Sequence, residues 1–180
     1  MHLNLVSSFI QLEKEITFLD HDQQIPVTYH NFIIVNKKFK NTGLTITLFE
    51  YFYRGMQERK QRQPQLSLLS YYVTATPSII YQTYKVFLNM VPSINNYNRM
   101  IFTDQEWHIA NELRKLRNWP TGVKSSNVNP FVLKGIMKSH YTTHEQMRID
   151  KIGKKTNYKI FQDLGIDESN GDQLLRFAFV

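Results

Sequence analysis

The chain has 180 residues and no cysteine, and its 22 lysines and arginines against 15 acidic residues give a formal net charge of +7 at pH 7. The length suits one ordinary domain or two small ones, and the lack of cysteine excludes disulfides, thiolate zinc sites and a cysteine nucleophile. No apolar run approaches the roughly 20 residues of a membrane-spanning helix. The first ten residues lack the features of a signal peptide, so we expect a cytoplasmic protein with no membrane partner.

The positive charge is concentrated in the middle of the chain. Residues 1–36 carry one lysine against four acids, and residues 164–180 carry one arginine against three. Residues 37–98 carry eight lysines and arginines against two acids. A basic region of this kind attracts polyanions and releases their counterions, which makes nucleic acid the first candidate partner.

The first predicted element is an amphipathic helix over residues 4–19, which with a linker forms an N-terminal unit, residues 1–28. Its apolar residues at helical spacing are Leu5, Phe9, Leu12 and Ile16. An amphipathic helix can bury its apolar face against a second copy of itself, so it is one candidate for a homodimer contact.

Residues 29–102 are predicted to form the next unit. A strand at residues 32–35 precedes a helix that ends before Pro64, and a short helix follows at residues 65–73. A turn at residues 74–76 leads into a helix at residues 77–90, where Thr76 and Pro77 provide an N-cap and a proline at the first position. The apolar runs at residues 90–94 and 99–102 flank asparagines, which predicts a β-hairpin.

The outer face of the predicted helix at residues 77–90 is polar and free of acids. Side chains that recur on it at steps of three and four residues are Ser78, Tyr81, Gln82 and Lys85. Such groups can hydrogen-bond base edges or phosphates. Ile80, Tyr84 and Phe87 occupy the other side, so the same helix also has a core face.

Residues 32–90 resemble the winged helix-turn-helix domains of plasmid and phage replication initiators, primosome-loading proteins and related bacterial regulators. The resemblance is carried by Leu44 to Tyr53, Leu66 to Val73 and Thr76 to Leu88, which match the three helices of that domain. It implies that the third of these is the recognition helix and that Ser78, Tyr81, Gln82 and Lys85 read bases. Winged helices also serve as protein-protein modules, so the resemblance leaves an interaction role open.

The remaining residues, 103–180, are predicted to form a small helical domain. A capping box at residues 103–106 starts a helix that ends near Asn118. Further helices are predicted at residues 131–141, 143–152 and 157–164. The apolar tail, residues 173–180, is expected to be a strand or helix packed on the body, or a contact for another subunit.

Basic residues outside the predicted recognition helix are candidates for phosphate binding. Those expected to hold phosphates are Lys37, Lys38, Arg59, Arg62, Arg99, Lys154 and Lys155. The last two lie in the densest basic stretch, residues 148–159, which could equally be a solvated surface loop.

Signatures of an enzyme are not found. His140 and His144 are four residues apart, a spacing that lets two imidazoles share a metal, but no third ligand lies at a suitable spacing. The chain contains neither a phosphate-binding glycine loop nor a GxSxG motif. We therefore expect no catalytic residue, no metal and no cofactor.

The sequence thus predicts a mainly α-helical protein with a small β-hairpin wing, built as a winged helix-turn-helix followed by a small helical domain. Its expected function is sequence-specific binding of duplex DNA, in transcription regulation or in plasmid or phage replication and maintenance, as a possible homodimer. The alternative is a protein-interaction adaptor in a replication, transfer or virion assembly.

Overall fold

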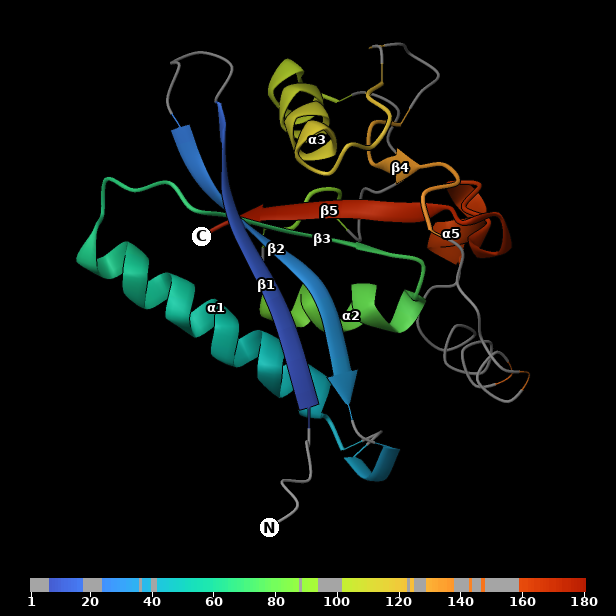
Figure 1. Cartoon of the computed structure of the whole chain (residues 1–180), viewed down its shortest axis with the longest axis horizontal. Helices are drawn as coiled ribbons and strands as arrows, with labels where there is room; N and C mark the ends of the chain where they lie inside the picture. The colour runs from blue at the N-terminus through green and yellow to red at the C-terminus, as the bar shows by residue number, and fades with distance from the viewer. Residues whose placement is uncertain are drawn as a thin grey trace.

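A five-stranded mixed sheet organises the chain (Figure 1). The computed structural model describes residues 7–17, 24–35, 37–39, 42–87, 89–93, 102–122, 124, 129–137, 143, 147 and 159–180. The strands are β1 (Ser7–Thr17), β2 (Gln24–Val35), β3 (Leu69–Thr74), β4 (Val132–Leu133) and β5 (Gln173–Phe179). Their order in the sheet is β1-β2-β3-β5-β4. Among these described strands only the β2–β3 pair is parallel, and α1 connects its two strands, as a parallel pair requires.

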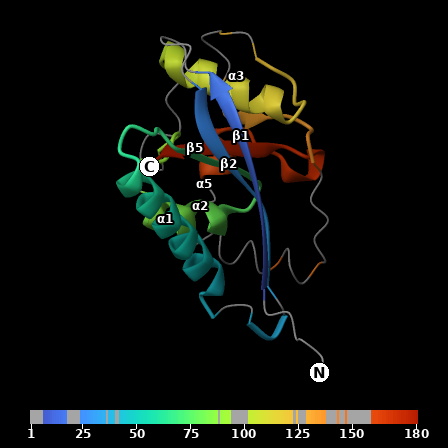
Figure 2. The ribbon, with the colours of Figure 1, turned by 60° about the vertical axis from the view of Figure 1, so that its left-hand side comes forward.

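Helices lie on both faces of this sheet (Figures 1 and 2). They are η1 (Lys37–Phe39), α1 (Leu44–Arg62), α2 (Pro77–Val86), α3 (Asp104–Leu116), α5 (Lys159–Asp163) and η2 (Glu168–Asn170). In both views α1 and α2 lie side by side under one face, whereas α3 lies over the other. The described residues contain no helix that is both long enough and apolar enough to cross a membrane.

The side chains of β3 and β5 point alternately to the two faces of the sheet, so the hydrophobic core is divided into one cluster on each face. Tyr71 of β3 belongs to the larger cluster with α3, and the next residue, Tyr72, belongs to a smaller cluster under α1 and α2. Phe177 and Ala178 of β5 divide in the same way. Successive side chains of a strand point to opposite faces, so β3 and β5 are buried on both sides.

Local signals set the helix ends. Thr103 and Glu106 form the predicted capping box, in which the Thr103 hydroxyl accepts from the Glu106 amide and the Glu106 carboxylate accepts from the Thr103 amide. Pro77 occupies the first turn of α2, as predicted, but the Thr76 side chain makes no capping hydrogen bond. α1 begins after Gly43, whose φ of 85° lies in the left-handed region that favours glycine.

The predicted fold class, mainly α-helical with a small hairpin wing, is wrong. A winged helix places a three-helix core before its hairpin, whereas this chain builds a five-stranded mixed sheet with helices on both faces. Residues 65–73, expected as the helix before the turn, contain most of β3, so no helix-turn-helix precedes α2. The recognition-helix geometry inferred from the resemblance is therefore absent.

The predicted N-terminal helix over residues 4–19 is also wrong, because residues 7–17 form the edge strand β1. Leu12 and Ile16 are four residues apart, which fits one helical turn and also two strand steps. The odd step from Phe9 to Leu12 favoured a helix. In the structure the register of β1 against β2 shifts between Ile10 and Gln11, because β2 carries one extra residue there, Asn31, at a bulge.

Other predictions have mixed outcomes. The helices at 77–90 and 157–164 exist in shorter form as α2 and α5, and the tail is the strand β5. The helix predicted from residue 131 is wrong at its start, where the two-residue strand β4 lies. Most of the expected hairpin and of the helix at 143–152 lies outside the described residues. The sheet takes strands from all three predicted units: 1–28, 29–102 and 103–180.

Candidate nucleic-acid interface

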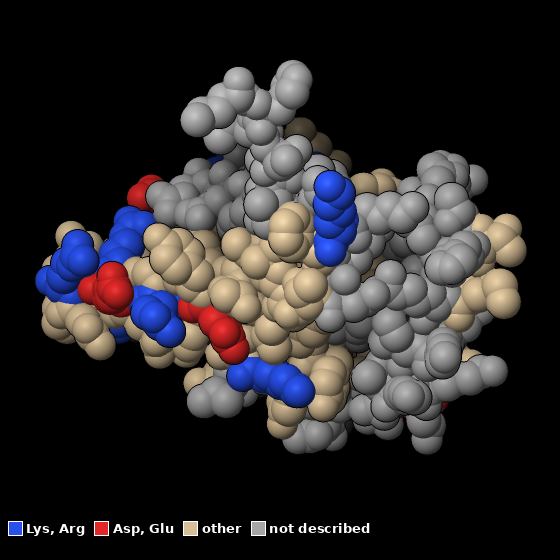
Figure 3. All heavy atoms as spheres, turned by 90° about the horizontal axis from the view of Figure 1, so that it is seen from below, with Lys and Arg blue, Asp and Glu red and all other residues tan. Residues whose placement is uncertain are grey.

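Basic side chains gather on the side of the molecule formed by η1, α1 and α2, which we call the basic face. Its described cationic side chains are Lys38, Arg54, Arg59, Lys60, Arg62 and Lys85. Acidic side chains on the same elements are Glu50 and Glu58. Glu15 of β1 adds a third, since its neighbour Ile16 packs in the cluster on the opposite side of the sheet. Figure 3 shows the molecule from this side, with basic side chains spread across it and fewer acidic ones between them.

The cations of α1 differ in how they are engaged. Arg54 is exposed and forms no hydrogen bond or ion pair with the described part of the chain. Arg62 lies 3.7 Å from the Glu58 carboxylate, but both side chains are more than half exposed, so this pair adds little stability. Lys60 Nζ donates to the Leu66 carbonyl at 2.6 Å and secures the turn after the helix. Arg54 and Arg62 therefore remain available to an anionic ligand.

Two of the predicted base-reading residues lie on the open outer side of α2. Tyr81 is 39% exposed, and Lys85, one turn later, is exposed with its Nζ 4.6 Å from the centroid of the Tyr81 ring. Lys85 has no carboxylate partner among the described residues. Gln82 is half-buried, and its buried Oε1 accepts no hydrogen bond from the part of the chain described. Ser78 is the second residue of α2, and its side chain lies outside the described atoms.

The predicted phosphate-binding residues are only partly brought together. Lys37 and Lys38 lie in η1, at the start of the connection from β2 to α1, and Arg59 and Arg62 lie in the last turn of α1. Remaining members of the predicted set lie outside the described residues, namely Arg99, Lys154 and Lys155. The same holds for the pair His140 and His144. Within the described ranges, no three His, Asp or Glu side chains cluster as metal ligands would.

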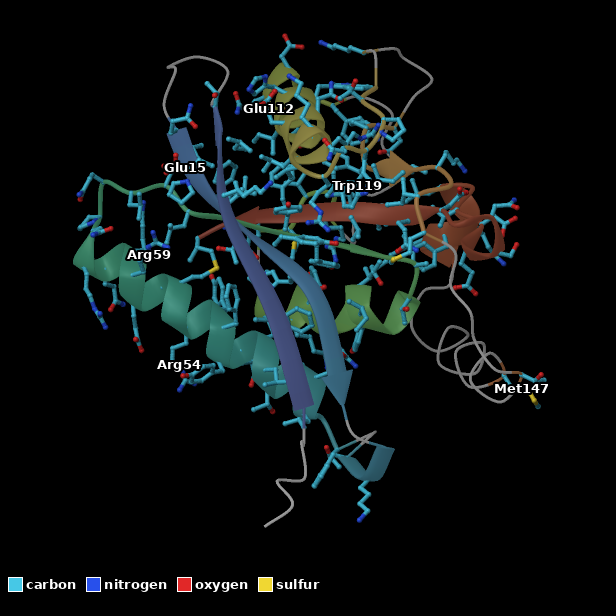
Figure 4. All side chains as sticks on the ribbon, in the orientation of Figure 1. Glu15, Arg54, Arg59, Glu112, Trp119 and Met147 are labelled. Atoms are coloured by element: carbon cyan, nitrogen blue, oxygen red, sulfur yellow. The ribbon has the colours of Figure 1, made fainter. Side chains whose placement is uncertain are left out.

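A hollow in the basic face includes residues that the sequence analysis did not select. Tyr51, Arg54 and Gly55 line it from α1, and Thr28 and Leu68 line it from the sheet side. Its volume is about 460 Å³, within the usual range of small-molecule sites. Figure 4 shows Arg54 and Arg59 projecting from different sides of α1. The positions i, i+3 and i+4 of Tyr51, Arg54 and Gly55 could have indicated a shared helix face, but the sheet residues have no such signal.

A buried arginine holds α2 against the sheet. Arg176 of β5 is 1% exposed, and its Nη1 donates to the Tyr72 hydroxyl at 2.9 Å and to the Ile80 carbonyl at 3.3 Å. Its Nε and Nη2 both donate to the Pro92 carbonyl, at 3.2 and 3.1 Å. The Tyr72 hydroxyl also bonds the Thr83 hydroxyl on the inner side of α2. These hydrogen bonds anchor α2 to the sheet, and Tyr81 and Lys85 lie on the outer side of this anchored helix.

A buried histidine lies beneath α1. The Nε2 of His30 lies 2.6 Å from the Ser70 hydroxyl, and its ring contacts Phe52 edge-on at a centroid distance of 4.1 Å. Burial lowers the pKa of His30 to about 3, so the imidazole is neutral at pH 7. His30 is therefore part of the support for α1 and adds no positive charge to the basic face.

The α3 side of the sheet has a different charge arrangement, because three of its described lysines are paired with carboxylates. The described ion pairs there are Lys124 with Asp104, Lys115 with Glu112, and Lys134 with Asp172. Arg114 is buried and donates to the Pro120, Pro130 and Val132 carbonyls. Arg54 and Lys85, which have no carboxylate partner in the described chain, belong to the basic face, whereas Lys14 on the α3 side donates to the Leu116 carbonyl.

Comparison of the chain with protein-family models, with curated proteins and with solved structures finds no match. The chemistry of the basic face is therefore the ground for a functional hypothesis.

Proposed function

We propose that this protein binds nucleic acid through the basic face, with phosphates contacted by the cations of η1, α1 and α2. The observation that carries the proposal is the exposure of Arg54 and Lys85 without carboxylate partners in the described chain, on two adjacent helices of one face. Nucleic-acid binding is dominated by phosphate contacts from lysine and arginine, which release counterions.

The outer side of α2 supports the same ligand class. Tyr81 offers a ring and a hydroxyl, and Lys85 offers an ammonium group, on a helix that has no acidic residue. These groups suit contacts to phosphates and to bases. The proposal uses the exposed chemistry of α2 and does not depend on a helix-turn-helix. Transcription regulation and plasmid or phage replication are the roles that it covers.

Binding to labelled duplex and single-stranded oligonucleotides, measured by fluorescence anisotropy at several salt concentrations, tests the proposal. We expect affinity to fall linearly with the logarithm of salt concentration. Arg54→Glu and Lys85→Glu should each weaken binding and lower the salt slope by about one.

Lys124→Glu is the matched control, because it makes the same change in net charge on the α3 side. It should leave most of the affinity intact. Absence of binding to either oligonucleotide at low salt would refute the proposal and leave the protein-interaction adaptor as the better reading. An equal loss in the Lys124→Glu variant would show that only net charge matters.

A further inference from the structure

A glycine of α1, Gly55, lines the hollow. Gly55 lies in the interior of a 19-residue helix, where glycine costs about 1 kcal/mol relative to alanine. A Cβ built on Gly55 meets no atom within 4 Å, so no packing contact requires glycine there. Its φ is not in the left-handed region either. The missing side chain instead leaves room over the outer surface of the helix.

The hollow extends along the helix as a groove. A second depression, of about 420 Å³, is also lined by Gly55, Glu58 and Arg59, and it continues past Arg62 to Gln63. The two depressions share three lining residues, so they run over the same helix turns. A chain-like ligand could therefore follow α1 from Tyr51 toward Arg62.

The side chains around Gly55 have complementary chemistry. Tyr51, one turn before it, is 77% exposed, which is unusual for so large an aromatic side chain. Arg54 and Arg59 add positive charge, and the Glu58 carboxylate is a hydrogen-bond acceptor. Apolar atoms at the sheet side come from Phe52, Met56 and Leu68. An exposed aromatic ring and arginines that line the same hollow, together with apolar atoms, are the chemistry that binds unpaired bases and their phosphates.

We propose that this groove binds a single-stranded segment of nucleic acid, with one unpaired base over Gly55 stacked on Tyr51 and the flanking phosphates on Arg54 and Arg59. This inference rests on the proposed function and specifies its ligand. In a duplex the bases are paired and stacked inside, so only an unpaired base can enter a groove of this kind. The protein should therefore prefer single strands to duplexes.

The test compares the affinities of the full chain for oligodeoxythymidine of about 12 nucleotides and for a mixed-sequence duplex of the same length. Tyr51→Ala should weaken single-strand binding about fivefold or more, since base stacking on an aromatic ring is lost. Tyr51→Phe keeps the ring and should retain the affinity. Duplex binding should change little in both variants.

Gly55→Leu places a side chain in the groove, starting from a Cβ position that has no atom within 4 Å in the free protein. We expect loss of single-strand binding with a thermal midpoint at or above that of the parent chain, because leucine favours helix over glycine. Gly55→Ala is the companion variant for folding, and it should raise the midpoint. If the groove does not bind nucleic acid, both Gly55 variants should instead be more stable than the parent chain and should bind the single strand with unchanged affinity.

The outcomes separate the two proposals. If neither nucleic acid binds the parent chain, the proposed function fails together with this one. If both bind and Tyr51→Ala and Gly55→Leu leave the single-strand affinity unchanged, the groove assignment is overturned and the basic face stands. Competition by polyglutamate that is equally sensitive to Tyr51→Ala would overturn it in favour of an acidic peptide.

Discussion

The guanidinium of Arg176 donates a hydrogen bond to the hydroxyl of Tyr72 at 2.9 Å, and both side chains are almost completely buried between the sheet and α2. The two residues lie opposite each other on β5 and β3. In the described chain no carboxylate pairs with this buried charge, and carbonyl and hydroxyl oxygens stabilise it instead. Each of these oxygens therefore matters for the stability of the α2 side.

Removal of the Tyr72 hydroxyl should be costly although the ring stays in place. We expect Tyr72→Phe to lower the free energy of unfolding by about 1–3 kcal/mol, because the Arg176 guanidinium loses an acceptor and the Thr83 hydroxyl loses a partner. Urea unfolding of the variant measures the change. Tyr51→Phe, at an exposed site, is the control and should stay within about 0.5 kcal/mol of the parent chain. Equal effects of the two variants would contradict the role of the buried network.

His30 should make the stability depend on pH in the acidic range. Its pKa is about 3 in the folded chain and about 6.5 when exposed, so the unfolded chain binds more protons between these values. Burial of the neutral His30 ring therefore costs no stability above about pH 6.5. As the pH falls from there toward 3, the free energy of unfolding should decrease by up to about 1.4 kcal/mol per pH unit, because the unfolded chain gains a proton that the folded chain does not. Urea unfolding of the parent chain and of His30→Leu at several pH values should show a shallower slope in the variant. Identical slopes would exclude His30 as the titrating group.

Asp172 should stabilise the junction between β4 and β5. Burial raises the pKa of this carboxyl, but the Lys134 ammonium and the amides of Asp167 and Gly135 outweigh that effect and hold it below its usual value. The ionised Asp172 carboxylate therefore stabilises the fold at pH values above the ordinary pKa of an aspartate. This stabilisation is lost as the pH falls through the lowered pKa of Asp172 in the folded chain. We expect Asp172→Asn to reduce the free energy of unfolding by about 1–3 kcal/mol at pH 7.

The measurement for Asp172 is urea unfolding at pH 7 and at low pH. The difference between the parent chain and Asp172→Asn should shrink at low pH, where the parent carboxyl is itself protonated. Asp163→Asn, at an exposed position of α5, is the control and should have little effect. A difference between parent and variant that does not change with pH would argue against the ionic contribution.

The capping box of α3 gives a fourth prediction. Thr103→Ala removes the hydroxyl that accepts from the Glu106 amide, and we expect a loss of about 1 kcal/mol in the free energy of unfolding. Thr103→Asn should restore most of it, since asparagine is also a good N-cap. Equal stability of the alanine variant and the parent chain would show that solvent satisfies the helix end equally well.

Elements with strong local signals could be predicted from the sequence. The capping box at Thr103 and the proline at residue 77 located α3 and α2, because these signals depend only on neighbouring residues. β3 could not be recognised in the same way. Its residues Leu69, Tyr71 and Tyr72 are buried on both faces, so they form an apolar run without strand alternation, and such a run resembles a short buried helix.

The candidate site also had parts that local sequence signals could predict and parts that they could not. The charges of α1 and the open side of α2 were visible in the sequence as residue types at helical spacing. The groove was not, because it depends on the absence of a side chain at Gly55 and on Thr28 and Leu68, which come from other elements. Nothing in local periodicity indicates that these segments meet.

The position of β5 also has a consequence for how the protein is made. Residues 173–179 lie between β3 and β4, and β3 pairs with a strand that follows it by about a hundred residues along the chain. During translation β1, β2 and β3 leave the ribosome long before this partner exists. Until then Tyr71 and Tyr72 border an unpaired strand edge, which is the kind of surface on which nascent chains aggregate. β5 can pair with β3 only after residues 173–179 have been synthesised. A chaperone that shields the free edge of β3 until then should therefore increase the yield of folded protein.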